Sequence, residues 1–285
     1  MFDFRYHALS LVAVFIALAL GLLLGVAIGD SGLVSNAERN IREDLRGDVR
    51  AANRRADEAL ESRDRLAEEL RASLPLMTDD RLTGSVGMVF LGQNSQAMAD
   101  NVREALAGSG AERASVATIR EPLDLDALAG DARGTRYAQL DADDPDLDLV
   151  ESLGFRLGAQ YVLPGRLLAR AQDALFSSLA GRLDPLQGVI VVRAQPGGMS
   201  KREDTVADRF EIGFVRGLRE TRVRVVGVEQ SSTRPSQVSW FEQRGISTVD
   251  DVERTVGRAA LVYVLAGARG NFGRKPTAEA LVPQP

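Results

Sequence analysis

The feature that most constrains this chain is an uninterrupted apolar segment at residues 8–28, ALSLVAVFIALALGLLLGVAI. It contains no charged residue and one hydroxyl group, that of Ser10. As a helix with a rise of about 1.5 Å per residue, it spans about 31 Å, which matches the hydrocarbon core of a bilayer. The segment therefore predicts a transmembrane anchor over residues 1–30.

A buried core helix and a cleaved signal peptide are the two alternatives. A helix at the surface of a globular domain has a polar face, whereas this segment is apolar all round. A signal peptide has a shorter apolar core and is followed by a small-residue cleavage site of the A-x-A kind, which is missing here. We therefore expect an uncleaved anchor.

The charges beside the anchor predict its orientation. Arg5 and the terminal amine precede it, and Asp30 follows it. The positive-inside rule then places the N-terminus in the cytoplasm and residues 31–285 on the other side of the plasma membrane. The expected localisation is a single-pass plasma-membrane protein whose bulk is extracytoplasmic.

Small residues recur at every fourth position of the anchor, at Ala13, Ala17, Gly21, Gly25 and Gly29. Such a row lets two helix backbones approach closely in a membrane, where lipid offers no hydrophobic drive for packing. The alternative is that glycine and alanine are simply common in membrane helices. The regular spacing favours helix association, and we expect a homodimer.

Residues 31–75 are rich in Arg, Glu, Asp and Ala, and Pro75 is the first proline of the chain. Spacings of four and three alternate along this stalk, as in the seam of a coiled coil. A single charged helix is the alternative, because alanine dominates the seam and Arg63 interrupts it. The self-associating anchor favours the coiled coil. Its seam is Leu45, Val49, Ala52, Ala56, Ala59, Leu66 and Leu70.

Residues 80–274 predict an α/β domain. Short apolar runs at 85–91, 114–119, 188–194 and 223–228 indicate strands, with a further short strand near 247–249. Helical stretches alternate with them, which favours a doubly wound, mostly parallel (Rossmann-like) sheet of four or five strands. The expected helices follow residue 95 and cover 147–158, 166–183, 203–219, 236–243 and 252–266, and a disordered tail is expected at 275–285.

The residue types exclude most familiar chemistry. The chain has no cysteine, and its one histidine, His7, lies at the edge of the anchor. Disulfides, thiolate ligands, Ser-His pairs and histidine metal clusters are therefore excluded from the outer domain. A net charge of −5 gives no reason to expect nucleic-acid binding. We expect no catalytic, cofactor-binding or metal residues and no enzyme activity.

Two loops are candidate ligand sites. The first, Gly92-Gln93-Asn94-Ser95, follows a strand but lacks a G-x-G-x-x-G fingerprint, so Asn94 or Ser95 is expected to cap a helix. The second, the acidic stretch 141–151, fails as a calcium loop because Asp146 replaces the turn glycine. It is expected to be a solvated loop that favours the next helix N-terminus.

Two glycine-containing loops remain. Residues 196–202 carry Lys201 and Arg202 at the end of a strand, where they could meet an anionic group. A plain surface loop is the preferred interpretation. Residues 267–273 have spaced glycines after a helix, which predicts a C-cap and a turn rather than a dinucleotide site.

Two patches carry a family resemblance. These are residues 1–15, MFDFRYHALSLVAVF, and residues 257–267, GRAALVYVLAG, with Asn271-Phe272-Gly273 close behind. They resemble the actinobacterial MctB "copper transporter" family, named for mycobacterial copper transport protein B. That family includes SteB, the partner of the membrane protein SteA in envelope integrity. The order of anchor, coiled coil and α/β domain is similar too.

The resemblance implies two functions. The family name implies copper efflux at an outer membrane, but the soft sulfur and imidazole ligands that copper prefers are scarce here, and no copper residue is assigned. Similarity to SteB implies a non-enzymatic interaction component of envelope integrity, with a SteA-like membrane protein or a cell-wall enzyme as partner. We prefer the second function, with copper transport as the alternative. An enzyme is least favoured, because no acid–base pair or nucleophile stands out.

Overall fold

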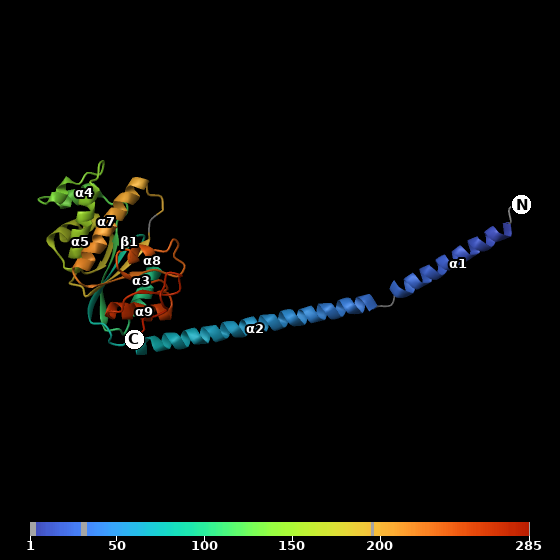
Figure 1. Ribbon diagram of the computed structural model, residues 1–285. Helices are drawn as coiled ribbons and strands as arrows, with labels where there is room; N and C mark the ends of the chain where they lie inside the picture. The colour runs from blue at the N-terminus through green and yellow to red at the C-terminus, as the bar shows by residue number, and fades with distance from the viewer. Residues whose placement is uncertain (1–3, 30–32, 195–196, 285) are drawn as a thin grey trace. The chain divides into compact units, whose positions relative to one another are not determined.

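The computed structural model describes residues 4–29, 33–194 and 197–284. The chain divides into two compact units, residues 1–66 and residues 67–285. The first unit is helical, and the second is a mixed α/β domain that includes the last turns of the stalk helix (Figure 1). Each unit is described by itself below.

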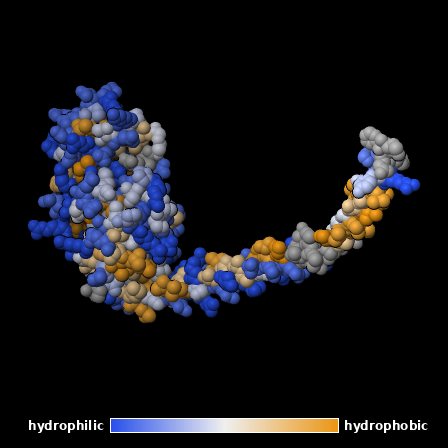
Figure 2. Space-filling view, turned by 45° about the vertical axis from the view of Figure 1, so that its right-hand side comes forward, coloured by the Kyte–Doolittle hydropathy of each residue, from blue (hydrophilic) through white to orange (hydrophobic). Residues whose placement is uncertain are grey.

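Two helices account for the first unit. Helix α1, Phe4–Gly29, is long and apolar enough to cross a membrane, and all of its described side chains are exposed. This helix fits a single-pass membrane protein. Helix α2, Leu33–Thr78, is rich in charged residues, but hydrophobic residues recur along it (Figure 2). Leu45, Val49 and Leu66 are each 57% exposed.

Helix α2 continues past the proline at which the stalk was expected to end. Pro75 lies inside the helix, one turn before its last residue, Thr78. The buried Thr78 hydroxyl donates to the Leu74 carbonyl oxygen at 2.9 Å. A proline this close to a helix C-terminus removes one backbone hydrogen bond and leaves few turns to disrupt. The helix therefore reaches into the second unit and ends there.

One sheet organises the α/β domain. Within the described residues its strand order is β3-β2-β1-β4-β5-β6-β7. All neighbouring strands are parallel except β2 and β3, which are antiparallel. The strands are β1 Gly84–Gly92, β2 Ala111–Ile119, β3 Phe176–Gly181, β4 Gly188–Ala194, β5 Arg224–Val228, β6 Ser247–Val249 and β7 Asn271–Phe272.

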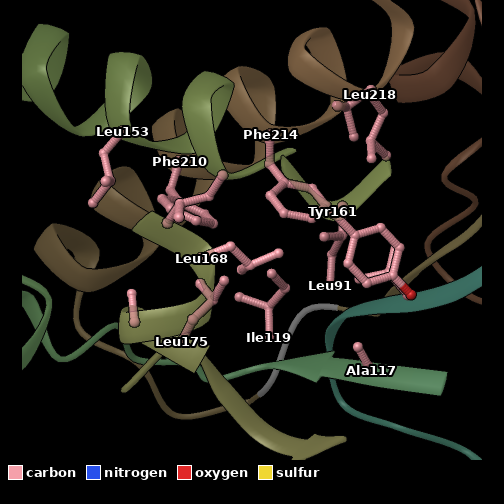
Figure 3. Packing of buried hydrophobic residues seen from close by; sticks show 14 of the residues in the cluster. Leu91, Ala117, Ile119, Leu153, Tyr161, Leu168, Leu175, Phe210, Phe214 and Leu218 are labelled. Carbon is pink, nitrogen blue, oxygen red and sulfur yellow. The ribbon is translucent and has the colours of Figure 1, made fainter. Parts of the chain in front are cut away.

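The sheet separates two hydrophobic cores, because successive residues of a strand point to opposite faces. On β1, Val89 and Leu91 join one core, and Met88 and Phe90 join the other. Part of the first core is seen in Figure 3. The helices are α3 Gln96–Leu106, α4 Leu125–Asp131, η1 Arg136–Gln139, α5 Leu147–Val162, α6 Arg166–Leu175, α7 Lys201–Glu220, α8 Val238–Glu242 and α9 Thr255–Ala266.

The strands expected from sequence are present, and two more are added. Helix α6 ends at Leu175, and β3 follows at once where the sequence predicted one helix over 166–183. Strand β3 lies at the edge of the sheet and has an exposed face. Its sequence FSSLAG therefore has only a weak hydrophobic pattern, and the strand is defined by its pairing with β2. Strand β7 has two residues and lies in a segment predicted to be a turn.

The end of the chain differs from the expected disordered tail. Lys275 is 9% exposed, and Ala280 forms an isolated bridge with Phe272. Val282 packs against the second core. Tertiary contacts order this segment, because its own sequence has no regular hydrophobic pattern. The α/β domain therefore extends beyond residue 274.

Helices α5 and α7 pack unusually closely, through glycines four residues apart on each helix. A Cβ atom on Gly158 would lie 2.8 Å from the Phe214 carbonyl carbon. A Cβ on Gly217 would lie 2.8 Å from the Ala159 amide nitrogen and would overlap the Phe155 carbonyl oxygen. The residue numbers of these contact pairs increase in the same direction along both helices, so the two helices run parallel. Their packing places Phe214 in the core beside Tyr161 (Figure 3).

Candidate functional site

The carboxyl ends of the parallel strands meet at one edge of the sheet, where parallel α/β proteins usually bind ligands. This edge also gathers buried charges. Large numbers of buried charged groups are rare in proteins unless they are paired, so the edge is the candidate functional site. The residues are Glu121 after β2, Arg193 on β4, Glu229 after β5, Asp250 and Asp251 after β6, and Lys275 after β7.

The Arg193 guanidinium is held by three side chains. Its Nε donates to Glu211 Oε2 at 2.7 Å, and its Nη1 donates to Gln237 Oε1 at 2.6 Å. Its Nη2 donates to Asp208 Oδ1 at 3.2 Å. The group also lies over the Trp240 ring, 4.6 Å from the ring centroid. Every nitrogen of the guanidinium is engaged, so its position is closely defined.

Glu121 and Glu211 form a carboxyl pair beside this arginine. Burial, reinforced by the Glu211 charge, raises the pKa of Glu121 to about 9. Burial also raises the pKa of Glu211, opposed by Arg193. The raised pKa favours the protonated form of Glu121 at neutral pH. Gly92 makes room for it, since a Cβ there would lie 3.0 Å from Glu121 Oε2 and would overlap Ala194.

A second network fastens the chain after β7 over the same edge. Lys275 and Glu229 form an ion pair whose side chains are both buried. Glu229 also accepts hydrogen bonds from the Gln237 backbone N–H and the Ser236 hydroxyl, each at 2.7 Å. Asp250 accepts from the Lys275 backbone N–H at 3.1 Å. The final segment of the chain thus covers the carboxyl ends of β5 and β6.

The chemistry open to this edge follows from these pairings. Among the described residues, no group of three or more His, Cys, Asp or Glu side chains is placed to hold a metal ion. Two buried ion pairs form at this edge, Arg193 with Glu211 and Lys275 with Glu229. These pairs make the edge rigid. The arrangement can hold a proton on Glu121 and a fixed positive charge on Arg193.

A cavity of about 320 Å³ is lined by Pro122, the residue after Glu121, and by Ser200 and Arg202 from the candidate anion-binding loop. The Ser200 side chain caps α7 in a reciprocal capping box with Glu203. Arg202 donates to the carbonyl oxygens of Ala142, at 3.1 Å, and Asp143. The loop is therefore tied to the acidic stretch. Residues 195 and 196 of this loop lie outside the described residues.

The other local predictions are confirmed as caps. Ser95 accepts from the Met98 N–H at 3.3 Å at the start of α3. Asp146 accepts from the Asp148 and Leu149 N–H groups at the start of α5. Gly267, with a φ of 130°, caps the end of α9. Ser95 and Asp146 thus begin α3 and α5, and Gly267 ends α9.

The residues predicted for association lie on α1 and α2. On α1, a Cβ atom added to Gly21, Gly25 or Gly29 would meet nothing within 4 Å. Ala13 and Ala17 are exposed on the same helix. The stalk residues remain a predicted seam. They are all exposed on α2: Leu45, Val49, Ala52, Ala56, Ala59, Leu66 and Leu70.

The carboxyl-edge network was not predicted from the sequence. One signal was present, because Arg193 is the single charge in the strand GVIVVRA, and a charge in a buried strand needs a partner. Glu211 gave no signal, since it occupies an amphipathic helix rich in charges. Lys275 was assigned to the expected disordered tail. Its partner Glu229 lies 46 positions away in the sequence.

The protein is of the class that joins an α/β domain to an apolar helix that fits a membrane span. A long charged helix and a mostly parallel sheet complete this class. The chain belongs to the MctB family, since the family model described as "Copper transport outer membrane protein, MctB" matches residues 1–283. This confirms the resemblance carried by the opening residues. No curated protein matches the chain.

Proposed function

We propose that this MctB-family chain is a non-enzymatic interaction component of the cell envelope. In this proposal α1 is a plasma-membrane anchor, α2 forms a dimeric coiled coil, and the α/β domain is presented outside the cytoplasm. Its partner is a SteA-like membrane protein or a cell-wall enzyme. The observation that carries the proposal is the uncovered apolar row along α2.

Exposure of this apolar row to water is unfavourable in free energy for a single helix. Leu45, Val49 and Leu66 each leave more than half of their surface exposed. Burying apolar surface is worth about 25 cal/mol per Å², so a second helix on this row stabilises both. Arg63 occupies one seam position, and a single polar residue there sets register at some cost in stability. The row therefore favours a specific two-helix pairing.

The domain supports a binding role over a catalytic one. At the carboxyl edge, Gln237 joins the Arg193–Glu211 pair to the Glu229–Lys275 pair, so this part of the edge is organised as a rigid scaffold. We also propose that the fold is doubly wound and Rossmann-like. The order β2-β1-β4-β5 with a core on each face supports this arrangement.

Cysteine crosslinking of the full chain in membranes tests the dimer, because the chain has no native cysteine. Leu66→Cys lies on the seam, and Arg65→Cys lies about 100° round the helix. We expect a disulfide-linked dimer from Leu66→Cys and little from Arg65→Cys. Equal crosslinking of the two variants would contradict a defined seam.

The orientation has its own test. Alkaline phosphatase, which is active only outside the cytoplasm, can be fused after the last residue. Activity is expected if the α/β domain is extracytoplasmic. A cytoplasmically maturing fluorescent protein that lights up at the same point would reverse the orientation and remove the cell-wall partner.

Copper transport is the second candidate, favoured by the description of the matching family. Copper would be a cargo that needs thioether or imidazole ligands in a chain without cysteine. Met88 and Met98 are buried in the core, so their sulfur atoms pack against other side chains and are not exposed to copper. We expect calorimetry of the full chain with copper to give no tight site. One tight site per chain would favour transport over the interaction role.

A further inference from the structure

A cavity of about 220 Å³ lies between the last turns of α2 and the first turn of α9. Its lining includes four arginines and one carboxylate, that of Glu253. All of its lining residues belong to the compact unit of residues 67–285. The arginines come from three separate segments: Arg71 from α2, Arg254 and Arg258 from the start of α9, and Arg274 from the chain after β7.

The positive charge of this cavity is only partly neutralised. The side chains of Arg71 and Arg254 make no hydrogen bond or ion pair within the described part of the chain. Arg274 Nε lies 3.8 Å from Asp251 Oδ2, a long contact. The Glu253 carboxylate, which accepts from the neutral Ser231 N–H at 3.2 Å, offsets one of the four positive charges. The lining thus has an excess of unpaired guanidinium groups.

Backbone donors add to this excess. Helix α9 has 12 residues and starts at Thr255 without a side-chain cap. Over the described residues, the N–H groups of Thr255, Val256 and Gly257 form no hydrogen bond. Thr255 and Val256 line the cavity. The first turn of a helix attracts anions through such free N–H groups and the helix dipole.

Arg258 is an independent observation. It lines the cavity, its side chain is 9% exposed, and its Nε atom has no hydrogen-bond partner in the described structure. Its other nitrogens hold Glu104 and, at 2.8 Å, Asn101. A buried donor without an acceptor is unfavourable. The hydrogen bonding of this guanidinium is therefore incomplete, although its position at the cavity wall is fixed.

We propose that this cavity binds an oxyanion of the phosphate type, either free phosphate or the phosphate of a lipid headgroup. Guanidinium groups suit such a ligand, because they match two phosphate oxygens with paired N–H donors. Asp251 opposes the ligand, since its carboxylate is fully buried against Gly257 and has no hydrogen-bond partner among the described residues. The site lies where the stalk helix meets the domain and goes beyond the proposed interaction role.

Calorimetry of the full chain in phosphatidylcholine nanodiscs tests the site. Inorganic phosphate is one probe, and glycerophosphoglycerol, a soluble form of an anionic lipid headgroup, is the other. Saturable binding of one probe is expected, and the tighter probe identifies the source. Arg71→Gln and Arg254→Gln should each weaken that binding by about tenfold. Arg269→Gln is the matched control, because this exposed arginine lies beyond the opposite end of α9.

Asp251→Asn sharpens the test in the opposite direction. Removing the opposing charge should tighten binding of the same probe by several-fold while leaving the arginines in place. Absence of saturable binding for both probes overturns the proposal. Equal weakening by Arg254→Gln and Arg269→Gln overturns it too, because binding would then reflect the general surface charge.

Discussion

Glycines with the same four-residue spacing lie in two different environments in this molecule. On α5 and α7, Gly154 and Gly158 face Gly213 and Gly217, and each row lies against the backbone of the other helix. On α1, a Cβ added at Gly21 or Gly25 would touch nothing within 4 Å. The pattern marks a helix surface that a second backbone can approach, but it does not say where that second backbone comes from.

The fold supplies the partner for α5 and α7. Both helices cover one face of the sheet, and their side chains Tyr161, Phe210 and Phe214 share one core. Nothing within the described chain covers the row on α1. A membrane helix in this state gains by pairing with another copy, which agrees with the proposed dimer.

The largest expected effect is in the domain. Gly217→Ala places a methyl group against Phe155 and Ala159, so the helices must separate. We expect a loss of about 3 kcal/mol of unfolding free energy, measured by denaturant unfolding of the full chain. Gly47→Ala is the matched control, because its Cβ meets open space on α2. It should be neutral or slightly stabilising, since alanine favours helix. Equal destabilisation by both variants would show that close packing is not the cause.

The buried carboxyl pair gives the next effect. The pKa of Glu121 rises from an ordinary 4.5 to about 9 in the folded domain. The folded state therefore binds the proton more tightly, and this group's contribution to stability is greatest below pH 4.5 and falls as pH rises to about 9. Glu121→Gln should raise unfolding free energy at pH 8 by about 2 kcal/mol and flatten its pH dependence. An unchanged pH profile would place the proton elsewhere.

The anchor row should give a smaller effect. Gly25→Ile places a bulky side chain on the row where a second helix would pack closely. We expect dimer affinity to fall by about tenfold, or about 1.4 kcal/mol. A membrane two-hybrid or crosslinking assay measures it. Leu23→Ile changes shape off the row and should leave association unchanged. If the two variants behave alike, the anchor glycines are incidental and the parallel with α5 and α7 fails.

The seam arginine should give the smallest effect. Arg63→Leu replaces a charged seam position by an apolar one and should strengthen stalk pairing by about 1 kcal/mol. It should also allow alternative registers, because a polar seam residue restricts them. The Leu66→Cys crosslink reports both changes. A weaker dimer in Arg63→Leu would mean that Arg63 makes a favourable contact across the interface.

The sequence determined the elements whose signal is local and periodic. A run of apolar residues as long as a bilayer is thick predicted α1, and one charged pattern without an early proline predicted a helix for the stalk. The buried strands at 85–91 and 188–194 were predicted because both of their faces are apolar. Caps such as Ser95 and Gly267 were predicted too, since capping depends on neighbours within a few residues.

The tertiary structure alone decided what depends on distant segments. Strand β3 is defined by β2, to which it is added as an edge. The Arg193 network joins β4, α7 and the N-cap residue of α8, and the buried Lys275 pairs with the distant Glu229. The pairing of α5 with α7 shows the same limit. A spacing in sequence describes one surface, whereas a contact needs two surfaces, and only the folded chain brings them together.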